Sequence, residues 1–123
     1  MILIDTSSLI DALTGPRRSL PRLRELIQEG EKIRLTTLAL FEWRRGPRIP
    51  QEIADQEILF PSDDAITFGT AEALLAADLY RKVKRPRGRE LDLAVAACAI
   101  IHNSSLWSLN PVDFKDVPNL KLL

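Results

Sequence analysis

Four carboxylate residues stand at positions in this sequence from which they could form one site: Asp5, Glu42, Asp92 and Asp113. Asp5 directly follows the short apolar run Ile2–Ile4, which is typical of a buried strand in a parallel sheet. In such a sheet, the ends of the strands and the starts of the following helices share one edge, where ligands bind. We therefore expect the four acids to meet there, Asp92 only if its helix also starts at that edge.

The neighbours of two of these acids are apolar. Glu42 stands between two aromatic residues and Asp92 between two leucines, and a charged side chain among core residues is rarely buried unless it is paired or binds a metal. Clustered carboxylates repel one another, and a divalent cation such as Mg²⁺ or Mn²⁺ relieves that repulsion and can support phosphodiester hydrolysis. Alternatively, Asp92 is only a charge favoured by a helix N-terminus and Glu42 is a surface residue.

The composition excludes several other kinds of site. Cys98 and His102 are the only cysteine and histidine, so an internal disulfide, a cysteine-based metal site and a histidine-pair zinc site are excluded. The 17 basic residues balance the 17 acidic ones, so net charge does not indicate a nucleic-acid partner, although local clusters still could. No apolar run approaches the ~20 residues that span a bilayer, and no signal peptide is recognisable. We expect one cytoplasmic domain over residues 1–123, without a membrane segment.

Short apolar runs alternate with segments of helical periodicity. Five strands are predicted, at Ile2–Ile4, Ile33–Leu35, Ile58–Phe60, Leu106–Ser108 and Leu120–Leu122. Helices are predicted at Ser7–Leu13, Leu20–Glu29, after Thr36 and Thr37, at Pro50–Gln56, Ala65–Lys84 and Leu91–His102, the last one buried. This order predicts a three-layer α/β/α domain with a central, mostly parallel five-stranded sheet. Trp43 and Trp107 are interpreted as core or dimer-interface residues rather than as base-stacking platforms, and Cys98 as a core residue.

Four stretches of the chain, taken together and in order, resemble a known family. They are ILIDTSSLID at the start, LTTLALFEW around Glu42, ELDLAVAACAI around Asp92, and LWSLNPVDFKDVPNLKLL at the end. They resemble the PIN domain, specifically the small VapC-like ribonuclease toxins of type II toxin–antitoxin systems, and the resemblance covers essentially the whole chain. It implies that Asp5, Glu42 and Asp92 form a metal site. Many relatives have Asp where this chain has Asn110. The fourth ligand of the metal site is therefore either Asp113 or the neutral Asn110.

The resemblance also implies an activity. It is that of a Mg²⁺- or Mn²⁺-dependent endoribonuclease, in which metal-held water attacks an RNA phosphodiester and leaves a 5′-phosphate and a 3′-hydroxyl. Asp5 and Asp92 would be the principal ligands, Glu42 would help hold the metal or orient the water, and Asp113 would complete the site. Ser7 matches the family's hydroxyl beside the first acid, where it could bond Asp5 or a phosphate. Thr6 would support Asp5, and both Thr6 and Asn110 are candidates for contact with the substrate.

Two groups of basic residues and the resemblance point to partners. Arg44, Arg45 and Arg48 form one group and Lys82–Arg89 another; they are either solvated helix ends or phosphate contacts, with Arg89 as the best single candidate. The resemblance implies an RNA substrate, a homodimer, and a VapB-like antitoxin whose tail lies over the acidic site and often places an Arg there.

Two other functions are weighed against the ribonuclease. A PIN-like module that binds RNA or protein without cutting is favoured by Asn110, because a neutral ligand would weaken the metal site. An aspartate-nucleophile phosphatase needs a second acid two residues after the first, and this chain has Ser7 there.

Overall fold

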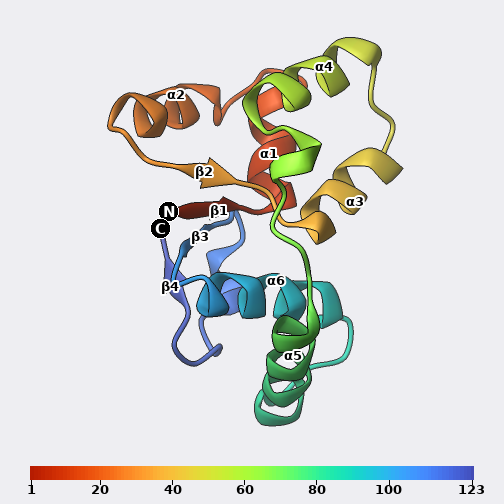
Figure 1. The fold of residues 1–123 in the computed structure, drawn as a ribbon, viewed down its shortest axis with the longest axis vertical. Coiled ribbons are helices and arrows are strands. Elements are labelled where there is room, and N and C mark those ends of the chain that lie inside the picture. Colours follow the sequence, from red (N-terminus) through yellow and green to blue (C-terminus); the bar gives the residue numbers. More distant parts are fainter.

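A four-stranded parallel sheet lies between two layers of helices in the computed structural model, which describes residues 1–123 (Figure 1). The strands are β1 (Ile2–Ile4), β2 (Ile33–Arg34), β3 (Ser105–Trp107) and β4 (Lys121–Leu122), in the order β2-β1-β3-β4. All neighbouring pairs are parallel, and Leu3 of β1 aligns with Arg34 of β2 and Leu106 of β3. The central strand β1 therefore ends beside β3, with Asp5 next in sequence.

The helices form two groups that cover opposite faces of this sheet, as Figure 1 shows. On one side lie α1 (Thr6–Leu13), α2 (Leu20–Gln28), α3 (Thr37–Arg45) and α4 (Pro50–Leu59); on the other lie α5 (Thr70–Lys82) and α6 (Glu90–Ile101). Two short 3₁₀ turns, η1 (Ser62–Asp64) and η2 (Pro111–Phe114), complete the set. None of the helices is both long and apolar enough to cross a bilayer.

The alternation of side chains along β1 divides the core in two. Ile2 and Ile4 pack with the α1–α4 layer, whereas Leu3 packs with α5 and α6. Helix α6 is buried without a break from Leu93 to Ala99, and its alanines allow it to lie close to the sheet. This confirms the predicted buried helix and the assignment of Cys98, Trp43 and Trp107 to the core.

The predicted fold class is confirmed, but the sheet has four strands rather than five. The predicted strand Ile58–Phe60 is wrong: Ile58 and Leu59 end α4, and the Phe60 N–H donates to the Gln56 carbonyl at 2.6 Å. Buried Gln56 also donates from Nε2 to the Phe60 carbonyl at 2.8 Å, which stabilises this helix end. A short apolar run does not distinguish a strand from the end of a helix.

What remains of a fifth strand is one isolated bridge, and it lies further along the chain. Ile66 pairs in parallel with Thr36; its N–H donates to the Leu35 carbonyl at 2.8 Å, and its carbonyl accepts the Thr37 N–H at 2.9 Å. The helix predicted from Ala65 therefore begins only at Thr70, after an N-cap at Gly69.

Candidate active site

Asp5 is fixed at the junction of β1, α1 and β3. Its side chain caps α1, with Oδ1 accepting the Thr6 N–H at 2.9 Å. The second oxygen, Oδ2, accepts hydrogen bonds from the Ser108 hydroxyl at 2.9 Å and the Ser7 hydroxyl at 3.3 Å. Its backbone N–H donates to the Trp107 carbonyl at 2.9 Å. With only 7 % of its surface exposed, this carboxylate is held in one orientation by donors suited to its charged form.

The two serines that bond Asp5 also hold the loop after β3. The Ser7 hydroxyl accepts the Leu109 N–H at 3.1 Å, and the Ser108 hydroxyl accepts the Asn110 N–H at 3.0 Å. Each serine thus donates to the acid and accepts from the loop. Ser7 contacts Asp5 as the sequence analysis allowed, whereas Ser108 was missed. The predicted strand Leu106–Ser108 included this residue, whereas β3 ends at Trp107, so Ser108 directly follows its strand as Asp5 follows β1.

Glu42 reaches the same region from α3. The Thr6 hydroxyl donates to Glu42 Oε1 at 3.0 Å, and Arg45 lies 3.7 Å from Oε2 on the next turn of the helix. The Glu42 side chain is 22 % exposed. Its exposure is intermediate between those of its neighbours, the buried Trp43 and the exposed Phe41. The interpretation of both aromatic neighbours of Glu42 as core residues is therefore wrong for Phe41 and correct for Trp43. Thr6 connects the two acids, because its N–H bonds Asp5 and its hydroxyl bonds Glu42.

Asp92 occupies the first turn of α6 and is half-buried. Burial raises the pKa of its carboxyl to about 6, and the charges of Asp5, Asp113 and Glu42 act in the same direction. Arg89 opposes them, and no hydrogen bond contributes. The helix therefore starts at the carboxyl edge of the sheet, and each of the other three acids lies within electrostatic range of Asp92. We call this set, Asp5, Glu42, Asp92 and Asp113, the acidic edge.

Asp113 and Asn110 lie on the segment that follows β3. Asn110 precedes η2 and its side chain makes no capping hydrogen bond, whereas Asp113 lies within η2 with an exposed side chain. Asp113 contributes to the raised pKa of Asp92. Asn110 is tied to the acidic edge through its backbone contact with Ser108.

Arg89 holds η2 against the start of α6. Its guanidinium bonds both carboxylate oxygens of Asp116, at 2.6 and 2.9 Å, and donates to the Asp113 carbonyl at 2.7 Å. The ion pair lowers the pKa of Asp116, and the Arg89 side chain is only 19 % exposed. Asp116 was not selected from the sequence, where no pattern connects it to Arg89. The predicted phosphate contact is thus engaged in an internal ion pair.

The donor atoms of the acidic edge suit a hard divalent cation. They are carboxylate oxygens with neighbouring hydroxyls, the oxygen ligands that Mg²⁺ and Mn²⁺ prefer, with no thiolate or imidazole among them. In their present positions, no three of the chain's Asp, Glu, His and Cys side chains are close enough to hold one ion together. Joint coordination therefore requires side-chain rotation, for which the exposed Asp113 and the partly exposed Glu42 have room.

The fold and the site together define a class of protein. It is an α/β domain whose carboxylates gather at the carboxyl edge of a parallel sheet. The family model of the PIN domain matches residues 2–120, and the chain belongs to the PIN domain family. It is 31 % identical over 126 residues to Ribonuclease VapC19 of Mycobacterium tuberculosis, in strain CDC 1551 / Oshkosh and in strain ATCC 25618 / H37Rv, with 98 % of each chain covered.

Solved structures share the fold at lower sequence identity. A chain of VapBC2 from Rickettsia felis, bound to a promoter DNA fragment, aligns with a TM-score of 0.77 and 22 % identity, covering 100 % of this chain and 98 % of that one. DNA-bound VapBC from Salmonella typhimurium gives a TM-score of 0.80 at 14 % identity, covering 99 % and 96 %. A toxin–antitoxin complex from Klebsiella pneumoniae gives 0.75 at 23 %, covering 98 % and 95 %. These similarities confirm the predicted fold.

Proposed function

We propose that this protein is a Mg²⁺- or Mn²⁺-dependent endoribonuclease that acts as the toxin of a type II toxin–antitoxin system. The observation that carries the proposal is the electrostatic state of Asp92, whose pKa is raised to about 6 by burial and by three other carboxylates. Such an arrangement is costly without a cation, and carboxylate clusters of this kind serve phosphodiester hydrolysis. The ribonuclease name of the curated relative supports the same function.

In this proposal the residues of the acidic edge have distinct roles. Asp5 and Asp92 hold the cation, and Glu42 and Asp113 complete the site from its more exposed side. When bound, the cation supplies positive charge to the phosphodiester and lowers the pKa of water. Asp5 is kept in position by the Ser108 and Ser7 hydroxyls, and the Thr6 hydroxyl orients Glu42. Asp92 has to lose its proton before it can ligate, so binding should be favoured above its pKa of about 6.

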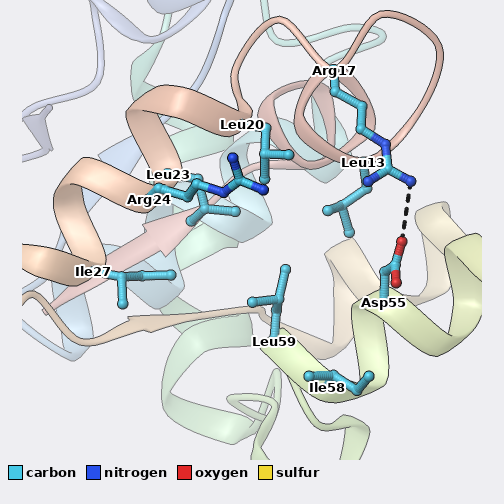
Figure 2. Close-up of a pocket in the computed structure, with 9 residues that line it drawn as sticks. All are labelled: Leu13, Arg17, Leu20, Leu23, Arg24, Ile27, Asp55, Ile58 and Leu59. Carbon is cyan, nitrogen blue, oxygen red and sulfur yellow. Dashed lines mark hydrogen bonds and ion pairs between the residues drawn. The ribbon is translucent and has the colours of Figure 1, made fainter.

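The partner in this proposal is a VapB-like antitoxin, as the toxin–antitoxin complexes among the similar structures suggest. An apolar groove of about 250 Å³ is formed by side chains of α1, α2 and α4, with arginines at its rim (Figure 2). Ile27 and Ile58 in this groove are 44 % and 78 % exposed. Arg17 is paired with Asp55 at 3.2 Å, whereas Arg24 takes part in no ion pair. The groove fits an apolar antitoxin segment that carries an acidic residue. A homodimer and a cytoplasmic location remain predictions.

Ribonuclease assays of the purified protein test the proposal. RNA should be cleaved with Mg²⁺ or Mn²⁺, cleavage should stop with EDTA, and Asp5→Asn and Asp92→Asn should each abolish it. Asp63→Asn is the matched control, because Asp63 is an exposed acid in η1 outside the acidic edge. Cleavage that survives EDTA, or that persists in both site variants, would contradict a metal-dependent mechanism.

A second candidate is a PIN-like module that binds RNA or protein without cutting. It is favoured by Asn110 in place of an acid and by the spacing of the four carboxylates, no three of which are positioned to share an ion. Calorimetric titration with Mn²⁺ separates the two candidates. Absence of Mn²⁺ binding together with retained RNA binding would select the module.

A further inference from the structure

A hollow of about 610 Å³ lies beside the acidic edge, and its lining is almost entirely charged. The connection between α5 and α6 contributes Lys84, Arg85 and Arg89 to this lining. The turn η2 and the residues after it contribute Asp113, Lys115 and Asp116, and the whole lining contains a single apolar residue. We call this site the basic hollow. Because Asp113 belongs to both sites, the basic hollow is continuous with the acidic edge.

The cations of the basic hollow are of two kinds. Arg89 is committed to Asp116 through two hydrogen bonds and is mostly covered. Lys84, Arg85 and Lys115 are exposed and take part in no ion pair. Three uncompensated positive charges therefore surround a cavity that opens beside a cluster of negative ones.

We propose that the basic hollow binds the phosphodiester backbone of RNA next to the phosphate that is cleaved, with Lys84, Arg85 and Lys115 as the phosphate contacts. This inference rests on the proposed ribonuclease function and adds to it the path of the substrate. In it, Arg89 is a positioning residue that ties Asp113 to the start of α6 and does not itself contact phosphate.

Two physical arguments favour RNA as the occupant. The chain has a net charge of zero, so no overall field attracts a polyanion, and the acidic edge repels one; cations next to it are needed to offset that repulsion. A protein segment would bury apolar surface, as protein interfaces do at their centres, and the basic hollow has only one hydrophobic lining residue. Exposed lysines act as point charges, so the contact should be independent of base sequence.

Binding measured without cleavage tests the inference. Fluorescence anisotropy of a labelled, mixed-sequence, single-stranded oligoribonucleotide is recorded in EDTA over a range of salt concentrations. The triple variant Lys84→Gln, Arg85→Gln, Lys115→Gln should bind about tenfold more weakly. Its plot of log affinity against log salt should be less steep by about 2, since each lost contact to a single strand contributes ~0.7. The matched control removes three exposed charges elsewhere, through Arg18→Gln, Arg22→Gln and Lys32→Gln, and should bind as the parent does.

The possible results separate this inference from the proposed function. If the parent cleaves RNA and the triple variant binds with unchanged affinity and salt dependence, the basic hollow is not the RNA site, although the ribonuclease function stands. If the parent neither binds nor cleaves RNA, the function itself fails. If the triple variant loses binding to a poly-glutamate peptide but keeps binding to RNA, the occupant is an acidic protein and the inference is overturned. An unchanged circular dichroism spectrum and melting temperature would show that the triple variant is folded. If it does not fold, Lys84→Gln and Lys115→Gln are measured singly, and each should lower the slope of log affinity against log salt by about 0.7.

Discussion

The Ser108 hydroxyl donates a 2.9 Å hydrogen bond to Oδ2 of Asp5, a residue 103 positions away in the sequence. The two side chains stand at the ends of neighbouring parallel strands, β3 and β1. The same hydroxyl accepts the Asn110 N–H, so this one group links the most buried acid of the site to the loop that leads to Asp113.

Ser108→Ala should therefore lower ribonuclease activity while leaving the fold intact. Loss of its hydrogen bonds to Asp5 and from the Asn110 N–H should cost about 2 kcal/mol of unfolding free energy, at about 1 kcal/mol each. Activity should fall about 10-fold, the lower end of the range for partners of metal ligands. Ser105→Ala, which changes the serine at the start of β3, is the control and should cleave at the parent's rate. Equal activity in Ser108→Ala and the parent would show that Ser7 and Thr6 suffice to hold Asp5.

Asp92 should make stability depend on pH in the metal-free protein. Its pKa is about 6 in the folded chain and 3.8 in the reference state, so the folded state binds this proton more tightly than the unfolded state. The resulting stability is complete below the lower pKa and is lost as pH rises through about 6. Because the group is half-exposed, we expect a loss on the order of 1 kcal/mol. Urea unfolding in EDTA from pH 4 to pH 7 should show this loss in the parent and not in Asp92→Asn; identical profiles would contradict the raised pKa.

Sequence reasoning identified the class of fold because the order of strands and helices follows from apolar runs and helix caps. It failed at Ile58–Phe60, where three apolar residues end a helix that is fixed by the buried contacts of Gln56. An apolar triplet looks the same in a strand and in the last turn of a helix, and only tertiary contacts decide between them.

Only part of the candidate site could be predicted from the sequence, for a similar reason. Asp5 stands out because it directly follows a central strand, whereas Ser108 was missed because the predicted strand Leu106–Ser108 extended one residue past the end of β3 at Trp107. The placement of Asp92 at the site depended on the direction of α6 relative to the sheet, which the sequence of this helix does not encode. The contact of Arg89 with Asp116 joins residues 27 positions apart and depends on how η2 packs on α6, so no local pattern predicts it.

Divalent cations should stabilise the folded protein. Bound Mn²⁺ relieves the repulsion around Asp92 and binds only the folded state, so the melting temperature should rise with Mn²⁺ concentration at pH 7. Asp5→Asn and Asp92→Asn should lose this rise, whereas Asp63→Asn should keep it. A rise of the same size in Asp92→Asn would place the cation elsewhere on the chain.

The groove of Figure 2 should control association with the antitoxin. Ile58→Asp and Ile27→Asp place a charge on exposed apolar positions, so folding should be preserved while co-purification with a co-expressed antitoxin is lost. Ile101→Asp, at an exposed apolar position at the end of α6, is the control and should retain the antitoxin. Retention of the antitoxin by both groove variants would exclude the groove as its binding site.

Arg89 provides a test that separates positioning from phosphate binding. Arg89→Lys keeps the positive charge but loses the two-pronged contact with Asp116. If Arg89 only holds η2 in place, both Arg89→Lys and Arg89→Gln should lower the cleavage rate about 10-fold through a displaced Asp113. Metal-free RNA affinity and its salt dependence should then stay near those of the parent, because this guanidinium is already paired. If instead Arg89→Gln reduces the salt dependence by about 0.7, as expected for one lost phosphate contact, and Arg89→Lys restores it, the guanidinium leaves Asp116 to bind RNA, and the original prediction of a phosphate contact is correct.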